Sequence, residues 1–241
     1  MLRASATAAL GAFVAACSKK IKPRAAATPS GSATPSSSGT PTPACVLRPE
    51  VTEGPYFIDE RLNRSDIRID PSDGSIKPGT ELQIVFKVSR VGRTCAPLQD
   101  AQVDVWHCDA TGLYSDEAAN DTIGKKFLRG FQKTDAEGTA RFTTIFPGWY
   151  SGRSIHIHFK IRILSGGTAT LQFTSQLFFD EQTTNTILAQ PPYQARGAPD
   201  TRNASDSVYA SNNNAGASLM LPITLQGAAY VGSFGVGLQT G

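Results

Sequence analysis

The stretch PGWYSGRSIHIHF, from Pro147 to Phe159, most strongly constrains the fold of this chain. Apolar residues alternate with histidines after Ser154, and this period of two is typical of a β-strand. Such a strand places His156 and His158 on one face, about 6–7 Å apart along the backbone. The chain has three histidines in all, so this pair indicates a chelating site, although a His-x-His pair can also be structural.

Several other segments have the same strand character and are separated by Gly, Pro, Asn and Asp. They are Glu81 to Ser89, Ala101 to His107, Thr139 to Ile145, Ser154 to Leu164, Thr170 to Phe179, Leu219 to Leu225 and Tyr230 to Leu238. No segment of the expected domain has a helical period over three turns. We therefore predict an all-β fold, a β-sandwich of mixed or antiparallel sheets with few short helices. Long loops at 46–80, 108–138 and 180–216 should be functional or carry small helices.

Composition permits one sizeable core. The chain has 241 residues, of which 40% are hydrophobic and 18% charged. The formal charge of +3 is small, and much of it lies close to the N-terminus, at Lys19, Lys20, Lys22 and Arg24. We therefore expect no nucleic-acid partner.

Residues 1–17 have the charged start, short apolar run and small-residue end of a secretory signal peptide. Cys17 follows two alanines, as in a lipobox, so we expect a lipidated Cys17 that attaches the protein to a membrane; a plain signal peptide is the alternative. Residues 18–44 read as a disordered tether rich in Pro, Ser and Thr. The predicted domain spans 45–241, outside the cytoplasm, either secreted or anchored at the cell surface.

Three cysteines fall within the predicted domain, at Cys45, Cys95 and Cys108. In an oxidising compartment, three cysteines predict one disulfide and one free thiol. The sequence does not show which two cysteines pair. Short ligand spacing between cysteines is absent, which argues against a zinc site.

Two tyrosines, Tyr114 and Tyr150, could complete a metal site with the histidine pair, although most tyrosines in β-proteins are packing residues. A phenol keeps its proton up to about pH 10, so it becomes a good ligand only for a strongly Lewis-acidic ion. Fe(III) is such an ion.

The chain resembles the intradiol ring-cleaving dioxygenases, the superfamily of protocatechuate 3,4-dioxygenase and catechol 1,2-dioxygenase, and more closely its secreted, single-domain branch. The resemblance covers roughly residues 45–240. Its landmarks are Thr52 to Phe57, Pro97-Leu98, Val105-Trp106, Gly112 to Tyr114, Arg129-Gly130, Pro147 to Tyr150, Arg153, His156 to Phe159 and Ser175 to Phe179.

This resemblance implies that Tyr114, Tyr150, His156 and His158 are the protein ligands of a non-haem Fe(III). Tyr150 matches the tyrosine that leaves the iron when substrate arrives and takes up a catechol proton, and Tyr114 matches the one that stays bound. No organic cofactor is implied.

The resemblance also implies two catalytic residues that are not ligands. Arg153 matches the arginine beside the substrate ring, and Gln176 matches the glutamine near that arginine. A surface ion pair is the alternative for Arg153, and a hydrogen-bonded sheet residue is the alternative for Gln176. For His107 we expect a structural role, and for Cys108 a place in a disulfide or in the core.

The implied activity is O2-dependent cleavage of a catechol-type ring to a cis,cis-muconate-type product. Only five residues separate Tyr150 from His156, so we expect a more open pocket than in the protocatechuate enzymes. A different class of function stays open at this point: a non-enzymatic, surface-anchored β-sandwich binding module whose histidines are structural or hold another metal.

Overall fold

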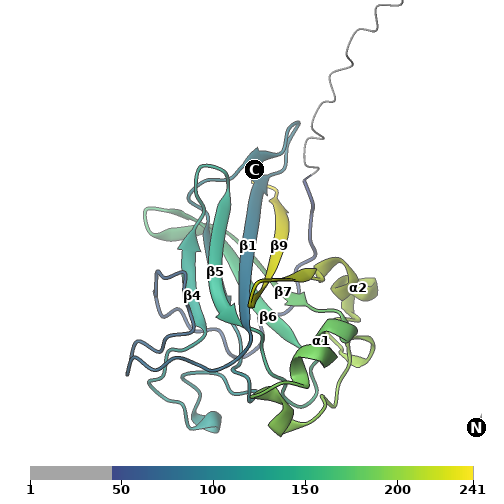
Figure 1. The fold of residues 1–241 in the computed structure, drawn as a ribbon. Coiled ribbons are helices and arrows are strands. Elements are labelled where there is room, and N and C mark those ends of the chain that lie inside the picture. The colour runs from purple at the N-terminus through teal and green to yellow at the C-terminus, as the bar shows by residue number, and fades with distance from the viewer. Residues whose placement is uncertain (1–44, 241) are drawn as a thin grey trace, which may run out of the picture. The chain divides into compact units, whose positions relative to one another are not determined.

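The computed structural model, which describes residues 45–240, is built around two β-sheets (Figure 1). The predicted signal peptide at 1–17, Cys17 and the tether at 18–44 lie outside the described residues. In the first sheet, β1 (Glu81–Arg90) pairs in parallel with β9 (Ala229–Leu238), and β8 (Ile223–Gln226) pairs antiparallel with β9. Both β2 (Ala96–Pro97) and β5 (Thr139–Ile145) pair antiparallel with β1.

The second sheet is antiparallel throughout, with strand order β4, β3, β6, β7. Its strands are β3 (Gln102–Trp106), β4 (Arg129–Lys133), β6 (His156–Ser165) and β7 (Thr168–Phe178). The predicted all-β sandwich of mixed and antiparallel sheets is therefore confirmed.

Aromatic side chains fill the space between the sheets. Phe86 of β1 lies 5.2 Å from Phe159 of β6, measured between ring centroids, and Phe159 lies 5.8 Å from Phe234 of β9. All three are almost completely buried, and each contributes roughly 1.5–3 kcal/mol by leaving water. Because strand side chains alternate, burying Phe159 between the sheets places His156 and His158 on the outer face of the second sheet.

A segment that we name the covering segment, residues 50–64, crosses that outer face. Its backbone begins on β7, where Val51 N donates to Thr174 O, and it ends on β4, where Arg64 N donates to Phe131 O. Between these points, Lys160 of β6 pairs with Glu53, and Arg162 lies 2.8 Å from Asp59. The outer face of the second sheet is thereby buried around His156 and His158, where Trp106, Cys108 and Tyr114 form a second, smaller cluster of buried side chains.

The helices are short and occupy two of the predicted long loops. They are α1 (Glu181–Leu188), α2 (Ser211–Asn214) and the 3₁₀ turns Ala118–Asn120, Tyr193–Arg196, Asn203–Ser205 and Ala215–Leu219. In Figure 1, α1 and α2 lie together at the lower right of the sandwich. Over residues 45–240, no helix has the length and apolarity needed to cross a membrane.

Two parts of the strand prediction are wrong. The expected loop 108–138 contains β4, whose sequence RGFQK does not alternate because it is partly covered on both faces. The expected strand Leu219 to Leu225 begins only at Ile223. Leu219 and Leu221 are buried and imitate strand alternation, but Leu219 ends a 3₁₀ turn.

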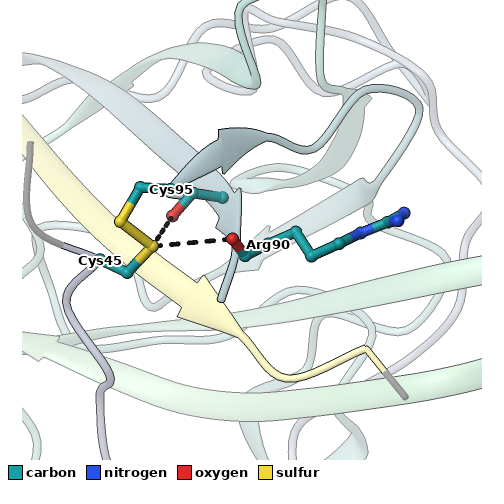
Figure 2. Close-up of a disulfide and its surroundings, with 4 residues drawn as sticks. Cys45, Arg90 and Cys95 are labelled. Atoms are coloured by element: carbon teal, nitrogen blue, oxygen red, sulfur yellow. Dashed lines mark hydrogen bonds between the residues drawn. A yellow bond between two sulfur atoms is a disulfide. The ribbon is translucent and has the colours of Figure 1, made fainter. Parts of the chain in front are cut away.

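Among residues 45–240, Cys45 and Cys95 form a disulfide, and Cys108 is a free, buried thiol. This confirms the predicted count and supplies the pairing that the sequence left open. Figure 2 shows the disulfide beside Arg90, whose carbonyl oxygen lies 3.6 Å from Cys45 Sγ. Next to it, Leu47 forms a bridge with Gly237 of β9, so the disulfide fixes the chain just before the covering segment.

We expect replacement of both Cys45 and Cys95 by serine to lower the free energy of unfolding by about 4 kcal/mol. The disulfide joins residues 50 apart in sequence, and its loss restores conformational freedom to the unfolded chain. Urea denaturation of the oxidised wild type and the variant measures the difference. Reduced wild type should match the variant, and equal stability of the oxidised wild type and the variant would contradict the expectation.

Candidate metal centre

The four predicted ligands lie together on the outer face of the second sheet. His156 and His158 come from β6, Tyr150 from the turn before it, and Tyr114 from the loop after β3. Tyr150 Oη is 3.0 Å from His156 Nε2, which is 3.1 Å from His158 Nε2. The Tyr114 ring centroid is 5.7 Å from that of Tyr150 and 6.2 Å from that of His158.

Both histidines are neutral at pH 7. His156 Nδ1 donates to the Ser154 carbonyl oxygen at 2.6 Å, so a neutral ring carries its lone pair on Nε2. Burial, aided by the nearby Arg153 charge, lowers the pKa of His156 to about 3. Burial also lowers the pKa of His158 well below its usual value, with a smaller contribution from His156. Both imidazoles are therefore available as metal ligands.

The hydroxyl groups of Tyr114 and Tyr150 lie in surroundings that a bound cation would stabilise. Tyr114 Oη is buried and has no hydrogen-bond partner among residues 45–240. Burial raises the pKa of Tyr114 well above its usual value and the pKa of Tyr150 to about 12. A buried hydroxyl without a partner costs about 1–3 kcal/mol, and a bound cation would remove this cost.

This donor set fits Fe(III). Imidazole nitrogens bind first-row metals at roughly 2.0–2.1 Å, so two nitrogens about 3 Å apart can share one ion. Within the described part of the chain, no three His, Cys, Asp or Glu side chains form a possible metal site. Tyr114 and Tyr150 lie beside the histidine pair, and hard phenolate oxygens suit a trivalent ion.

Close backbone packing holds Tyr114 against the turn that carries Tyr150. Gly112 has a φ of +84°, and a Cβ there would lie 2.1 Å from the Trp149 carbonyl oxygen. Asp109 shapes the same loop, since its Oδ1 accepts from the backbone N–H of Thr111 and of Leu113. Only glycine at 112 permits this contact between the two loops.

The covering segment adds aromatic walls that the sequence did not assign. Tyr56 stacks on Tyr114 with ring centroids 4.2 Å apart. Phe57 packs against Trp106, which stacks on His158 at 5.0 Å. The motif Thr52 to Phe57 signalled this segment, but its position over the histidines depends on pairing with β4 and β7.

Arg153 and Gln176 lie beside the four clustered side chains. Arg153 Nη2 donates to Gln176 Oε1 at 2.6 Å, and Nη1 is 3.4 Å from His156 Nε2. Arg153 Nε donates to Asp206, a buried residue that sequence reasoning missed. Gln176 is completely buried, and its Nε2 donates to the Thr52 carbonyl oxygen. Arg153 is therefore no surface ion pair, and Gln176 bonds to groups of the site.

His107 and Cys108 have structural partners instead. His107 Nδ1 is 2.8 Å from the Cys108 carbonyl oxygen, and Nε2 is 2.6 Å from Thr144 Oγ1, so neither ring nitrogen is free. Cys108 Sγ donates to the Gly148 carbonyl oxygen, and burial raises the pKa of the thiol. These contacts agree with the expected structural role of His107 and the expected core position of Cys108.

We expect Gly54→Ala to weaken metal binding at this centre roughly 10-fold, the lower end of the effect of losing a group that supports a metal ligand. Gly54 has a φ of +70°, and a Cβ there would lie 3.2 Å from His158 Cε1. Gly74→Ala is the matched control, because Gly74 has a φ of +76° with nothing within 4 Å of its added Cβ. Titration of both variants with iron distinguishes a steric effect on His158 from backbone strain at a glycine with positive φ. Equal losses of iron affinity in the two variants would contradict the expectation.

The profile of the family described as Dioxygenase (Dioxygenase_C) matches residues 52–226. Chlorocatechol 1,2-dioxygenase from Cupriavidus pinatubonensis is 27% identical over 145 residues, covering 50% of this chain and 52% of that protein. Catechol 1,2-dioxygenase from Candida albicans is 32% identical over 101 residues, covering 40% and 31%. The chain thus spans about half the length, or less, of these curated relatives.

Solved structures agree with this match. An intradiol ring-cleavage dioxygenase from Tetranychus urticae superposes with a TM-score of 0.67 at 32% identity, covering 81% of this chain and 94% of that one. The dioxygenase domain of a dioxygenase carbohydrate-binding protein fusion from Streptomyces sp. SirexAA-E gives 0.57 at 28% identity, covering 81% and 100%. Since the matched residues form most of the chain and include all four clustered side chains, this chain belongs to the intradiol ring-cleavage dioxygenase superfamily.

Proposed function

We propose that this protein is an Fe(III)-dependent intradiol dioxygenase that cleaves a catechol-type ring with O2. The bond between the two hydroxylated carbons breaks, and both oxygen atoms enter a cis,cis-muconate-type diacid. Tyr114, Tyr150, His156 and His158 would hold the iron. The observation that carries the proposal is the clustering of four side chains: His156 Nε2 lies 3.0 Å from Tyr150 Oη and 3.1 Å from His158 Nε2. Beside them lies Tyr114 Oη, which has no hydrogen-bond partner among residues 45–240.

Bound there, Fe(III) would supply a Lewis acid to which both catechol oxygens bind as the deprotonated dianion, the electron-rich form of the ring that reacts with O2. In the phenolate form that would bind the iron, Tyr150 Oη could accept a proton from an incoming catechol hydroxyl, and its half-buried position next to His156 leaves it within reach of such a ligand. The Arg153 charge would stabilise the negative charge that develops on the ring during oxygen attack. Gln176 holds the guanidinium in place through its Oε1.

Water exclusion supports the same assignment. Tyr114, His156 and His158 are almost completely buried, and Trp106 and Tyr56 stack on two of them. Side chains that exclude water strengthen electrostatic interactions inside the site and protect a reactive ring from side reactions.

The test is an aerobic assay of the purified protein with catechol, protocatechuate and hydroxyquinol, following O2 uptake, muconate absorbance and iron content. We expect one iron per chain, a reddish Fe(III)-phenolate colour and muconate formation. Iron without turnover would direct the search toward other catechols. A colourless protein that binds no iron and shows no turnover would favour the binding-module alternative.

We also propose that the enzyme acts outside the cytoplasm, as a secreted or lipid-anchored protein. This rests on the signal-like residues 1–17 and the lipobox-like position of Cys17. Mass spectrometry of the mature N-terminus tests it: a lipid-modified Cys17 supports anchoring, cleavage without lipid supports secretion, and an uncleaved Met1 contradicts both.

A further inference from the structure

Asp206 is a completely buried carboxylate in the loop between the Asn203–Ser205 turn and α2. Its Oδ1 accepts from the backbone N–H of Val208 and Tyr209, at 2.8 and 2.9 Å. Its Oδ2 accepts from Arg153 Nε at 2.8 Å and from Ser154 N and Oγ, at 2.7 and 3.2 Å. Burying a charge without partners costs several kcal/mol, so these donors explain how the carboxylate is tolerated.

The two carboxylate oxygens bind different parts of the chain. Oδ1 accepts from backbone N–H groups of its own loop, whereas Oδ2 accepts from Arg153 and Ser154, in the segment that leads into β6. Ser154 donates to Oδ2 through both N and Oγ, and its carbonyl oxygen accepts a hydrogen bond from His156 Nδ1. One oxygen of Asp206 therefore fixes both the Arg153 side chain and the backbone that orients His156.

The Arg153 guanidinium is held from two sides. Asp206 accepts from Nε and Gln176 accepts from Nη2, and Gln176 is in turn bonded to the covering segment through Thr52. A planar guanidinium held at two nitrogens has a fixed plane. Its third nitrogen, Nη1, then lies beside His156 Nε2, the atom that faces the candidate metal centre.

We infer that Asp206 is a positioning residue for ring cleavage, which holds the Arg153 guanidinium with Nη1 directed into the site. The inference rests on the proposed function and extends the active site to the loop 203–210. Asp206 touches neither the ligand atoms nor the expected substrate position, so its effect on ring cleavage passes through Arg153, whose Nη1 faces the site.

The first variant is Asp206→Asn. An amide can keep its oxygen toward Val208 and Tyr209, but its NH2 then faces the donors of Arg153 and Ser154 and cannot accept from them. We expect kcat to fall roughly 10–100-fold with iron content retained. We also expect weaker binding of catechol to the iron-loaded protein without O2, measured by the visible absorption change.

A double-mutant cycle with Arg153→Met distinguishes positioning of Arg153 by Asp206 from a merely structural role of Asp206. If Asp206 acts through Arg153, Asp206→Asn should change kcat and anaerobic catechol affinity little in the Arg153→Met background. Glu181→Gln is the matched control: Glu181 anchors the same loop at Asn203 N but does not contact Arg153. This control should keep wild-type kcat.

Asp206→Glu, which keeps the charge but displaces it by one methylene, is measured in parallel in case the Asn variant does not fold. An iron-loaded Asn or Glu variant with wild-type kcat and catechol affinity overturns the inference. The inference is also overturned if the double variant lowers kcat by the product of the two separate effects, because Asp206 would then act independently of Arg153. Absence of turnover in the wild type would instead count against the proposed function.

Discussion

His158→Ala is expected to abolish iron binding and, with it, turnover and the Fe(III)-phenolate colour. His158 is completely buried, its Nε2 is 3.1 Å from His156 Nε2, and Trp106 stacks on its ring. Losing an outer-shell partner costs roughly 10–100-fold in metal affinity, and loss of a ligand should exceed this. Metal analysis and the visible spectrum of the purified variant measure the effect.

His107→Ala is the control for this change. His107 is equally buried, but its ring bonds to Thr144 Oγ1 and the Cys108 carbonyl oxygen rather than to the site. Its loss should lower the free energy of unfolding by about 1–3 kcal/mol and leave one iron per chain. Equal iron loss in the two variants would overturn the proposed ligand set.

Alternation predicted the strands whose two faces differ in burial. In β1, Leu82, Ile84, Phe86 and Val88 are buried while Gln83 and Lys87 are exposed, so the sequence shows the period directly. The same period in β6 placed both histidines on one face. It could not predict that this face is also buried, because the cover comes from a segment about 100 residues earlier.

The burial and contacts of two charged residues, Arg129 and Asp206, escaped prediction, because their partners come from distant segments. Arg129 is almost completely buried in β4, where its guanidinium bonds to Ser115 and to the Tyr56 carbonyl oxygen. A charged residue in a short strand gives no hydrophobic signal. Asp206 likewise stands in a polar loop, and only folding brings it to Arg153.

The four candidate ligands required more than periodicity. Spacing placed His156 and His158 together, but nothing local links Tyr114 to Tyr150, which are 36 residues apart. Resemblance to a known superfamily joined them, and the structure brings them together through the contact of Gly112 with Trp149. Family motifs thus supplied the long-range information that pattern analysis lacks.

Arg153→Met is expected to lower kcat by roughly 10²–10³-fold, the effect of removing one group that stabilises developing charge. Iron content should not change, because Arg153 is not among the proposed ligands. Arg153 lies beside His156 and bonds to Gln176 and Asp206, so its charge is fixed before substrate arrives. Steady-state kinetics on iron-loaded protein, corrected for iron content, measure the loss.

Arg153→Lys distinguishes charge from geometry. Lysine keeps the positive charge but lacks the planar fork that reaches Asp206 and Gln176 together. If a fixed charge assists ring cleavage, kcat of the lysine variant should lie between those of the wild type and Arg153→Met, because its charge is present but less well oriented.

In the methionine variant Asp206 still accepts from Ser154, Val208 and Tyr209, so this variant should fold. Full kcat in an iron-loaded Arg153→Met variant would show that the guanidinium does not act on the reacting ring.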